Sequence, residues 1–477
     1  MTSHRATTAT PVPQRLRQAR VPLAGLVLLV LAIDAGVSAG SRGFDSATLL
    51  RTGLVAAAVL AVLWLQRFEY LLLTVLAVRP LLDISKTGGG GAVLSSGLAG
   101  LLVVGVVLWL VAQVRGGTLR RISVLGRLSV LLLAVMTVSA LVADDPVRDL
   151  LQVARLAAAV ALFLAVEQLA VDERSRRRFL LVCYASAVVP LVVGLGQFAT
   201  GDYRKVSDGL GRVTGTFLHP NAFGFYLVLL LTMGAAVFRH VRGGARILVA
   251  VVMAAGAVEM LLTYSRGSWI SVVAGVLVVG LLQSRKLLLL VPAGIALVPL
   301  VAPSVLTRIS DLSRGETING TPGNSFLWRI SHWGVVLKGV KGHELLGLGP
   351  SSSDYLGDEV LPPHNDFVRM YVETGVLGMV VYLAVLVAAV VVAVRAVRAV
   401  PAGTLARGVA VGAVGCTVAF LVDSTGGNLI SEVAVLLYMF TFLGLASSLT
   451  TGRPAAAPLP VRPAGPPAVG VGTAVGS

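Results

Sequence analysis

The sequence is poor in charged residues, and this shortage excludes a soluble fold. Only 13% of its 477 residues are charged, whereas 56% are hydrophobic, and the mean hydropathy is +0.87. A soluble domain carries about 25% charged residues, because its surface must be hydrated. Most of this apolar surface must therefore face lipid, and the chain is predicted to be a multi-pass protein of the cell (plasma) membrane.

Cysteine and the common cofactor motifs are also scarce. Cys183 and Cys416 lie in separate apolar runs, which excludes a disulfide framework and a cysteine-based metal site. No Walker loop, zinc motif or calcium loop occurs, so no metal and no cofactor are predicted. Asp34, Glu259 and Asp423 lie near or within apolar runs and are candidate proton-relay groups. However, the paired acidic residues and half-helix repeats that are typical of transporters are missing.

The charge that is present is mostly positive, with a formal net charge of +16. In a membrane protein, this excess indicates basic cytoplasmic loops beside anionic lipid rather than a nucleic-acid partner. With the N-terminus inside, the strongly basic short loops fall on the cytoplasmic side. The sequence therefore predicts an N-in, C-in topology with membrane lipids as partners and no nucleic acid.

Long apolar runs predict an all-α fold, a polytopic transmembrane helical bundle of about 12–14 spans. The candidate spans are residues 22–39, 47–66, 68–83, 93–114, 124–143, 150–171, 179–199, 221–239, 246–263, 267–283, 286–303, 374–397, 407–424 and 430–449. The predicted organisation is a basic cytoplasmic N-terminus (1–20), N-terminal spans (21–199), a second membrane domain (200–450) and a disordered cytoplasmic tail (451–477). A small-residue motif at residues 37–39 resembles a signal-peptide cleavage site, but the long run and the many spans that follow favour an uncleaved first span.

Three predicted outer segments are basic, which the positive-inside bias opposes. They are residues 200–220, 264–267 and 304–373. Their clustering indicates an anionic ligand at the outer membrane face. The third segment is also too long for a simple connector, so it is predicted to be functional.

An amphipathic helix is predicted inside this long outer loop. Residues 326–340 place Phe326, Ile330, Trp333 and Leu337 at helical spacing. Such a helix can lie on the membrane surface.

Two arginines outside this helix are candidate ligands for the anion. Arg212 shortly precedes residues that can cap the next helix, and a helix N-terminus with an arginine can hold a phosphate. Arg266 lies in a turn between two spans, where a charge is costly and the planar guanidinium matches a phosphate. The alternatives are an ordinary loop and cap for Arg212, and a snorkelling interfacial arginine for Arg266.

His364 is the candidate base. It lies where the long loop enters the next span, and histidine titrates near neutral pH, so it can take a proton from a hydroxyl. Glu373 follows nine residues later, about two and a half helical turns, and is expected to face the same cavity. Arg329 on the predicted amphipathic helix becomes informative only together with these residues.

Several short motifs between residues 200 and 400 occur in a fixed order. They are Gly215-Thr216-Phe217 with Pro220-Asn221, Ser265-Arg266-Gly267, Arg329 with Trp333, Gly347-Leu348-Gly349-Pro350, and His364-Asn365 with Glu373, Gly375 and Gly378. In order and spacing, this set resembles the O-antigen ligase and polymerase superfamily of membrane glycosyltransferases. Residues 1–180 resemble that superfamily only as a run of spans.

The resemblance implies an inverting, metal-independent glycan transfer at the outer face of the membrane, with residues 200–450 as the catalytic domain. Arg266 and Arg329 would bind the diphosphate of an undecaprenyl-linked glycan donor. His364 would be the general base for the hydroxyl of a glycan or lipid acceptor. The other residues expected to bind substrate are Arg212, Asn365, Glu373 and Lys338. Ligase and polymerase activities both stay open.

Two rival functions also stay open. A peptidoglycan polymerase of the shape-and-division family similarly ends a large outer loop with an Asp-Phe pair, like Asp366-Phe367, before an acidic-Gly helix entry. The span count and the Ser-Arg-Gly turn argue against it. A flippase or transporter for a lipid-linked sugar would need cationic residues along a path through the membrane, whereas here they gather at one face.

Overall fold

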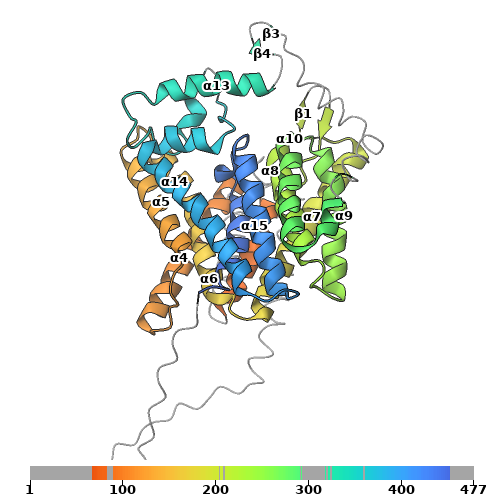
Figure 1. Ribbon diagram of the computed structural model, residues 1–477. Coiled ribbons are helices and arrows are strands. Elements are labelled where there is room, and N and C mark those ends of the chain that lie inside the picture. Colours follow the sequence, from red (N-terminus) through yellow and green to blue (C-terminus); the bar gives the residue numbers. More distant parts are fainter. Residues whose placement is uncertain are drawn as a thin grey trace, which may run out of the picture.

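The computed structural model describes residues 67–82, 90–203, 205–207, 210–289, 292, 317–318, 321–322, 325–357 and 360–451, which form a helical bundle (Figure 1). Within these ranges, nine helices are long and apolar enough to cross a membrane. They are α4 (Gly90–Arg115), α5 (Val124–Leu141), α6 (Pro146–Leu169), α7 (Glu173–Thr200), α8 (Pro220–Val237), α9 (Gly244–Leu262), α10 (Arg266–Gln283), α14 (Asp366–Ala399) and α15 (Leu405–Ser424). The predicted all-α, multi-pass membrane fold is confirmed.

Shorter elements complete the part of the chain that the structure describes. They are α3 (Phe68–Val78), α13 (Ser325–Gly339), α16 (Val433–Ser447), the 3-10 turns η3 (Ser352–Tyr355) and η4 (Leu429–Ser431), and two small hairpins, β1 (Lys205–Ser207) with β2 (Leu210–Arg212) and β3 (Thr317–Ile318) with β4 (Thr321–Pro322). The predicted span 68–83 forms only the 11 residues of α3, and 430–449 forms the 15 residues of α16. The predicted spans 22–39 and 47–66, nearly all of 286–303, the N-terminus 1–20 and nearly all of the tail 451–477 lie outside the described residues.

The centre of the bundle is built around α8 and α15. Helix α8 is apolar around its whole circumference and almost fully buried, as expected for a helix surrounded by other helices. Helix α15 packs against α8, α10 and α14, while α16 packs against α6. Gly275 of α10 and Gly415 of α15 face each other so closely that a Cβ on Gly415 would lie 2.9 Å from the Gly275 carbonyl oxygen. These small residues allow two membrane helices to approach.

The connections between helices divide into two ends. One end, formed by the α4–α5, α6–α7, α8–α9 and α14–α15 connections, is strongly basic. Its arginines include Arg115, Arg120, Arg121, Arg174, Arg176, Arg177, Arg178, Arg239, Arg242, Arg398 and Arg407. The other end, here called the site end, comprises the α5–α6, α7–α8, α9–α10 and α15–α16 connections with α13 lying across them (Figure 1). That the site end faces outward stays a prediction.

Helix α14 is broken at Gly375, where residues 344–349 of the segment that follows α13 pack against it. Gly375 has φ 65° and ψ −167°, a conformation that only glycine adopts readily. Beside the break, the Val376 N–H donates to the Glu344 carbonyl at 2.8 Å. The helix itself begins at Asp366, eight residues before the start that hydropathy predicts, because its first turns carry polar side chains.

We expect Gly375→Ala to destabilise the fold by about 1–3 kcal/mol, because alanine strains this backbone conformation. Its Cβ would also collide with the backbone of Leu345. Thermal unfolding of the purified protein in detergent measures the loss. Gly334→Ala is the matched control, since a Cβ there meets no atom within 4 Å and the helix α13 favours alanine over glycine. Equal melting temperatures for both variants and the wild type would contradict the expectation.

Candidate active site

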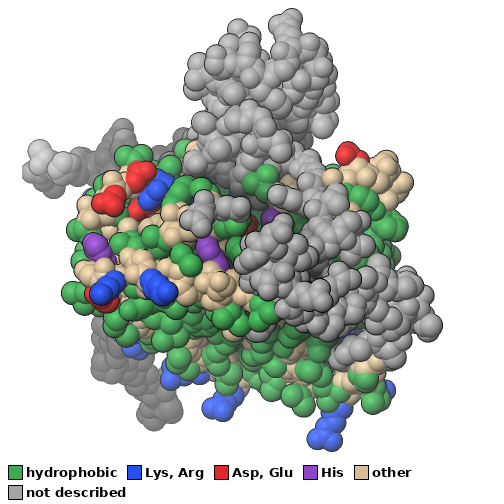
Figure 2. Space-filling model, turned by 90° about the horizontal axis from the view of Figure 1, so that it is seen from above, with side chains coloured by type: hydrophobic (Ala, Val, Ile, Leu, Met, Phe, Trp, Pro, Cys, Tyr) green, Lys and Arg blue, Asp and Glu red, His purple; other side chains and the backbone are tan. Residues whose placement is uncertain are grey.

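A cavity of about 230 Å³ opens at the site end and gathers residues from distant parts of the chain. Its lining consists of Arg212, His219, Asn221, Tyr264, Ser265, Arg266, Gly267, Trp328, Arg329, His364, Asp423, Gly426 and Gly427. Four of the residues selected from the sequence, Arg212, Arg266, Arg329 and His364, therefore meet here. Figure 2 looks down on this end, where histidine side chains are visible among hydrophobic and uncharged ones.

Arg212 joins two of the segments that line the cavity. It ends strand β2, and its buried guanidinium donates through Nε to the Thr263 carbonyl at 2.7 Å and through Nη2 to Asn221 Oδ1 at 2.8 Å. Asn221 lies in the first turn of α8, and Thr263 precedes the turn into α10. Arg212 therefore fixes the distance between two helix N-termini at the edge of the cavity.

Arg266 is the first residue of α10, so its side chain and the helix N-terminus add their positive potential. The turn before it is tight, and Tyr264 has φ 49°. Gly267 is required next to it because the Asp423 carboxylate lies against its Cα, where a Cβ would collide. A guanidinium at a helix N-terminus is well suited to a phosphate group.

Helix α13 brings Arg329 and Trp328 to the cavity. The predicted amphipathic helix is confirmed, but Ile330 and Leu337 of the predicted apolar face are exposed. The buried positions are instead His332, Val336 and Val340.

Two side chains of α13 attach it to the segment that leads into His364. The Trp333 Nε1–H donates to the Pro363 carbonyl at 2.6 Å, and the His332 Nε2–H donates to the Leu361 carbonyl at 3.1 Å. The helix therefore lies fixed beside His364.

His364 has an unusual backbone and a neutral ring. Its φ of 50° is rare for a residue other than glycine and is tolerated because the residues on either side are held by hydrogen bonds. Burial, followed by the positive charge of Arg329 and the proximity of His219, lowers the pKa of His364 from 6.5 to about 3. The imidazole is thus uncharged at neutral pH, as a base must be before it accepts a proton.

The cavity lining does not include three residues that were expected to bind substrate. Lys338 is exposed on α13. Asn365 caps α14, with Oδ1 accepting from the Phe367 and Val368 N–H groups, so its side chain is used by the fold.

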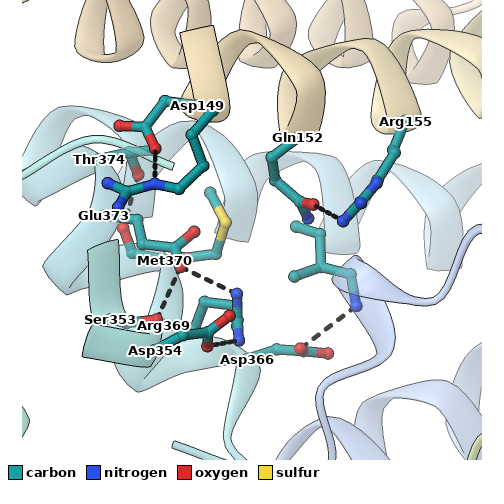
Figure 3. Close-up of polar contacts among 12 residues, drawn as sticks. Asp149, Gln152, Arg155, Ser353, Asp354, Asp366, Arg369, Met370, Glu373 and Thr374 are labelled. Carbon is teal, nitrogen blue, oxygen red and sulfur yellow. Dashed lines mark hydrogen bonds and ion pairs between the residues drawn. The ribbon is translucent and has the colours of Figure 1, made fainter. Parts of the chain in front are cut away.

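Glu373 is the third of these residues, and it is occupied by a buried ion pair. Its Oε1 accepts from Arg369 at 2.9 Å and from the Ser353 hydroxyl at 2.6 Å. Arg369 also pairs with Asp354, so that one guanidinium joins α14 to η3 (Figure 3). Arg369 and Glu373 are only 2% and 1% exposed. The network anchors the end of the long loop rather than lining the cavity.

The structure adds residues that sequence reasoning did not assign to the site. His219 caps α8 through Nδ1, which accepts from the Asn221 N–H at 3.1 Å, and its ring centroid lies 6.4 Å from that of His364. Trp328 stacks on His332 with centroids 4.9 Å apart and meets His364 edge-on at 6.4 Å. Asp423 also lines the cavity, but the sequence indicated only that it is an ionisable residue at the end of a span.

A known protein family matches part of the chain. Residues 248–383 match the family described as O-antigen ligase, and this segment contains Arg266, Arg329 and His364. A comparison with curated proteins gives no match. Residues 248–383 of this multi-pass membrane protein are therefore similar to the O-antigen ligase family.

Proposed function

We propose that this protein transfers a glycan from an undecaprenyl-diphosphate donor to the hydroxyl of an acceptor at the extracytoplasmic face of the membrane. The observation that carries the proposal is the meeting of Arg212, Arg266 and Arg329 with the neutral His364 in one cavity. Three guanidinium groups and the N-terminus of α10 suit a diphosphate. Membership of the O-antigen ligase family supports glycosyl transfer as the reaction class.

In the proposed reaction, the acceptor oxygen attacks the anomeric carbon of the donor. The bond between that carbon and the diphosphate oxygen breaks, and its electron pair leaves with the diphosphate. The arginine side chains stabilise this developing charge, while His364 takes the proton of the acceptor hydroxyl. The donor is already activated, so neither a nucleotide nor a metal is required in this scheme.

The position of Asp366 disfavours the rival peptidoglycan-polymerase scheme, in which this aspartate would be the essential group. Asp366 is fully buried at the start of α14. Its Oδ2 accepts from the Ser424 hydroxyl at 2.9 Å and its Oδ1 from the Ile430 N–H at 3.3 Å. Both carboxylate oxygens therefore join the start of α14 to the end of α15 and to η4. Asp366 is not among the residues that line the cavity. Arg212, Arg266 and Arg329 meet in one cavity at the site end rather than along a path through the membrane, which likewise favours an enzyme over a flippase.

Glycan transfer by the purified protein in nanodiscs tests the proposal. The reaction combines an undecaprenyl-diphosphate oligosaccharide with candidate acceptors, with and without EDTA. We expect product that resists EDTA and is lost in Arg266→Ala. Arg242→Ala is the matched control, because Arg242 is exposed at the opposite, basic end. A longer lipid-linked glycan would identify a polymerase, and transfer to a separate acceptor a ligase. Full activity of Arg266→Ala would refute the site.

The pH dependence of the rate should reveal how the donor acts on His364. A bound diphosphate would offset the positive charge of Arg329, which contributes to the low pKa of the free enzyme, so donor binding should raise the pKa of His364 from about 3. Because kcat/KM for the donor reports the free enzyme and kcat the complex, the acid limb of kcat should lie at higher pH. Initial rates between about pH 2 and pH 8, a range that includes the pKa of about 3 of the free protein, measure both limbs. Coincident limbs would contradict this expectation.

A further inference from the structure

Asn428 contacts the ring nitrogen of His364 that the proposed reaction does not use. It follows the Gly426-Gly427 pair after α15, and its Nδ2 lies 2.8 Å from His364 Nδ1. Because Nδ1 contacts Asn428, Nε2 is the ring nitrogen that can act on a substrate in the cavity that His364 lines. A histidine that acts as a base commonly has such a partner, which fixes the tautomer and the orientation of the ring.

The contact between Asn428 and His364 is held on both sides by other hydrogen bonds. On one side, Asn365 Nδ2 donates to the Thr425 carbonyl at 3.2 Å. On the same side, the Ser424 hydroxyl donates to Asp366, and on the other side the Ile430 N–H donates to Asp366, as described above. The loop after α15 is thereby joined to the segment around His364 at three points, and the ring and the amide cannot easily separate.

The chemistry of the amide determines which nitrogen of His364 carries the proton. In the structure, Asn428 Nδ2 donates to Nδ1, which places the proton of the neutral ring on Nε2. In that tautomer, Nε2 cannot accept a proton. Asn428 Oδ1 is buried and has no hydrogen-bond partner within the part of the chain that the structure describes. A half-turn of the amide would direct Oδ1 to Nδ1–H and leave Nε2 unprotonated, able to accept a proton. In either orientation of the amide, one of its two atoms would hydrogen-bond Nδ1.

We propose that Asn428 is the positioning residue that sets the tautomer of His364, and that its Oδ1 accepts from Nδ1–H in the reacting form. The inference rests on the proposed function. As the acceptor hydroxyl proton moves to Nε2, the ring becomes an imidazolium whose Nδ1–H remains bonded to Oδ1. The amide thus stabilises the charge that forms on the base. In the resting orientation the enzyme is unable to use His364 as a base.

The groups that act electrostatically on His364 come from several elements and must be considered when its titration is read. They are Arg329 and His332 of α13, His219 before α8, and Arg369 of α14, while Arg212, Arg266 and Asp423 line the same cavity. Asn428 is uncharged, so replacing it with aspartate adds one negative charge beside Nδ1 and leaves these groups in place.

Three variants of the purified protein separate a role in positioning from a role in folding. Asn428→Asp can only accept from Nδ1–H when ionised, so it should keep Nε2 free, retain activity and move the acid limb of kcat upward by about one pH unit or more. Asn428→Ala should lower kcat by about 100-fold without changing donor affinity. Thr425→Ala is the control, since that hydroxyl is exposed and, among the described residues, donates to the carbonyl of Val422 alone.

A spectroscopic measurement tests the inference independently of activity. The chain has six histidines, so ¹⁵N-histidine spectra are simple, and His364→Ala identifies the His364 signal by its loss. Asn428→Asp should show the Nδ1–H tautomer and a raised pKa, and Asn428→Ala a mixture of tautomers. Identical His364 tautomers and titrations in the wild type and both variants would overturn the role of Asn428. Absence of transfer by the wild type would instead count against the proposed function.

Discussion

Replacing His364 with alanine is expected to lower the kcat of glycan transfer by about 10²–10⁴-fold, the usual contribution of a general base. The ring lines the cavity together with three arginines and is uncharged at neutral pH, so it can take the proton of an acceptor hydroxyl. The affinity for the donor should change little, because the arginines that would bind the diphosphate stay in place. Steady-state rates with saturating donor, together with a donor-binding titration, separate these two effects.

The matched control is His343→Ala. His343 is an exposed histidine of the segment between α13 and α14, and it is not part of the cavity lining. Its variant should transfer glycan at the wild-type rate. If His364→Ala retained kcat within about threefold, a general-base role would be excluded. If His343→Ala lost activity to the same extent, the effect would belong to the loop rather than to the ring at position 364.

Arg369→Leu is expected to destabilise the folded protein by about 3–5 kcal/mol, because it leaves buried carboxylates without their cationic partner. Glu373 is 1% exposed, and Arg369 is the cation that pairs with its carboxylate. A charge at such depth is costly to leave unpaired. Thermal or chemical unfolding in detergent measures the loss, and the yield of folded protein should fall with it.

The double variant Arg369→Leu/Glu373→Leu distinguishes an unpaired charge from lost packing. Replacing both members of a buried pair with apolar residues is often close to neutral, so the double variant should recover most of the stability. Arg242→Ala is the surface control, because Arg242 is exposed at the basic end and such surface substitutions change stability by about 0.5 kcal/mol or less. A single variant that unfolds at the wild-type temperature would show that the network does not support the fold.

Hydropathy was sufficient to predict the nine long helices of the described residues, because lipid requires that most side chains of a membrane-spanning helix be apolar. The nine long helices fall where apolar runs of about 20 residues occur. The start of α14 was wrong by eight residues because hydropathy reports only the polarity of its first turns, not their helicity. The break at Gly375 was beyond prediction for a related reason. It depends on backbone hydrogen bonds from residues 344–349, which leave no mark on polarity.

The selected residues that the structure brings together are those that are unusual at their own positions. Arg266 between two spans and His364 at the entry of a span are costly or rare there, and the structure brings both to the cavity. Glu373 was wrongly expected to face the cavity, because the spacing from His364 ignored the competing partner Arg369 one helical turn away. Asn428 lies 64 residues from His364 and is an unremarkable loop asparagine in the sequence. Only the fold reveals their contact.

The cavity is assembled from more of the chain than the family domain covers. Arg212 precedes residues 248–383, and Asp423 and Asn428 follow them. In a chimera that takes only residues 248–383 from a relative, the counterparts of Arg266, Arg329 and His364 would come from the relative. Arg212 and Asn428 would still come from this chain. Sugar specificity should transplant cleanly only when residues 212–221 and 423–428 travel with it. The smallest segment that carries every residue of the cavity is therefore longer than the segment that matches the family.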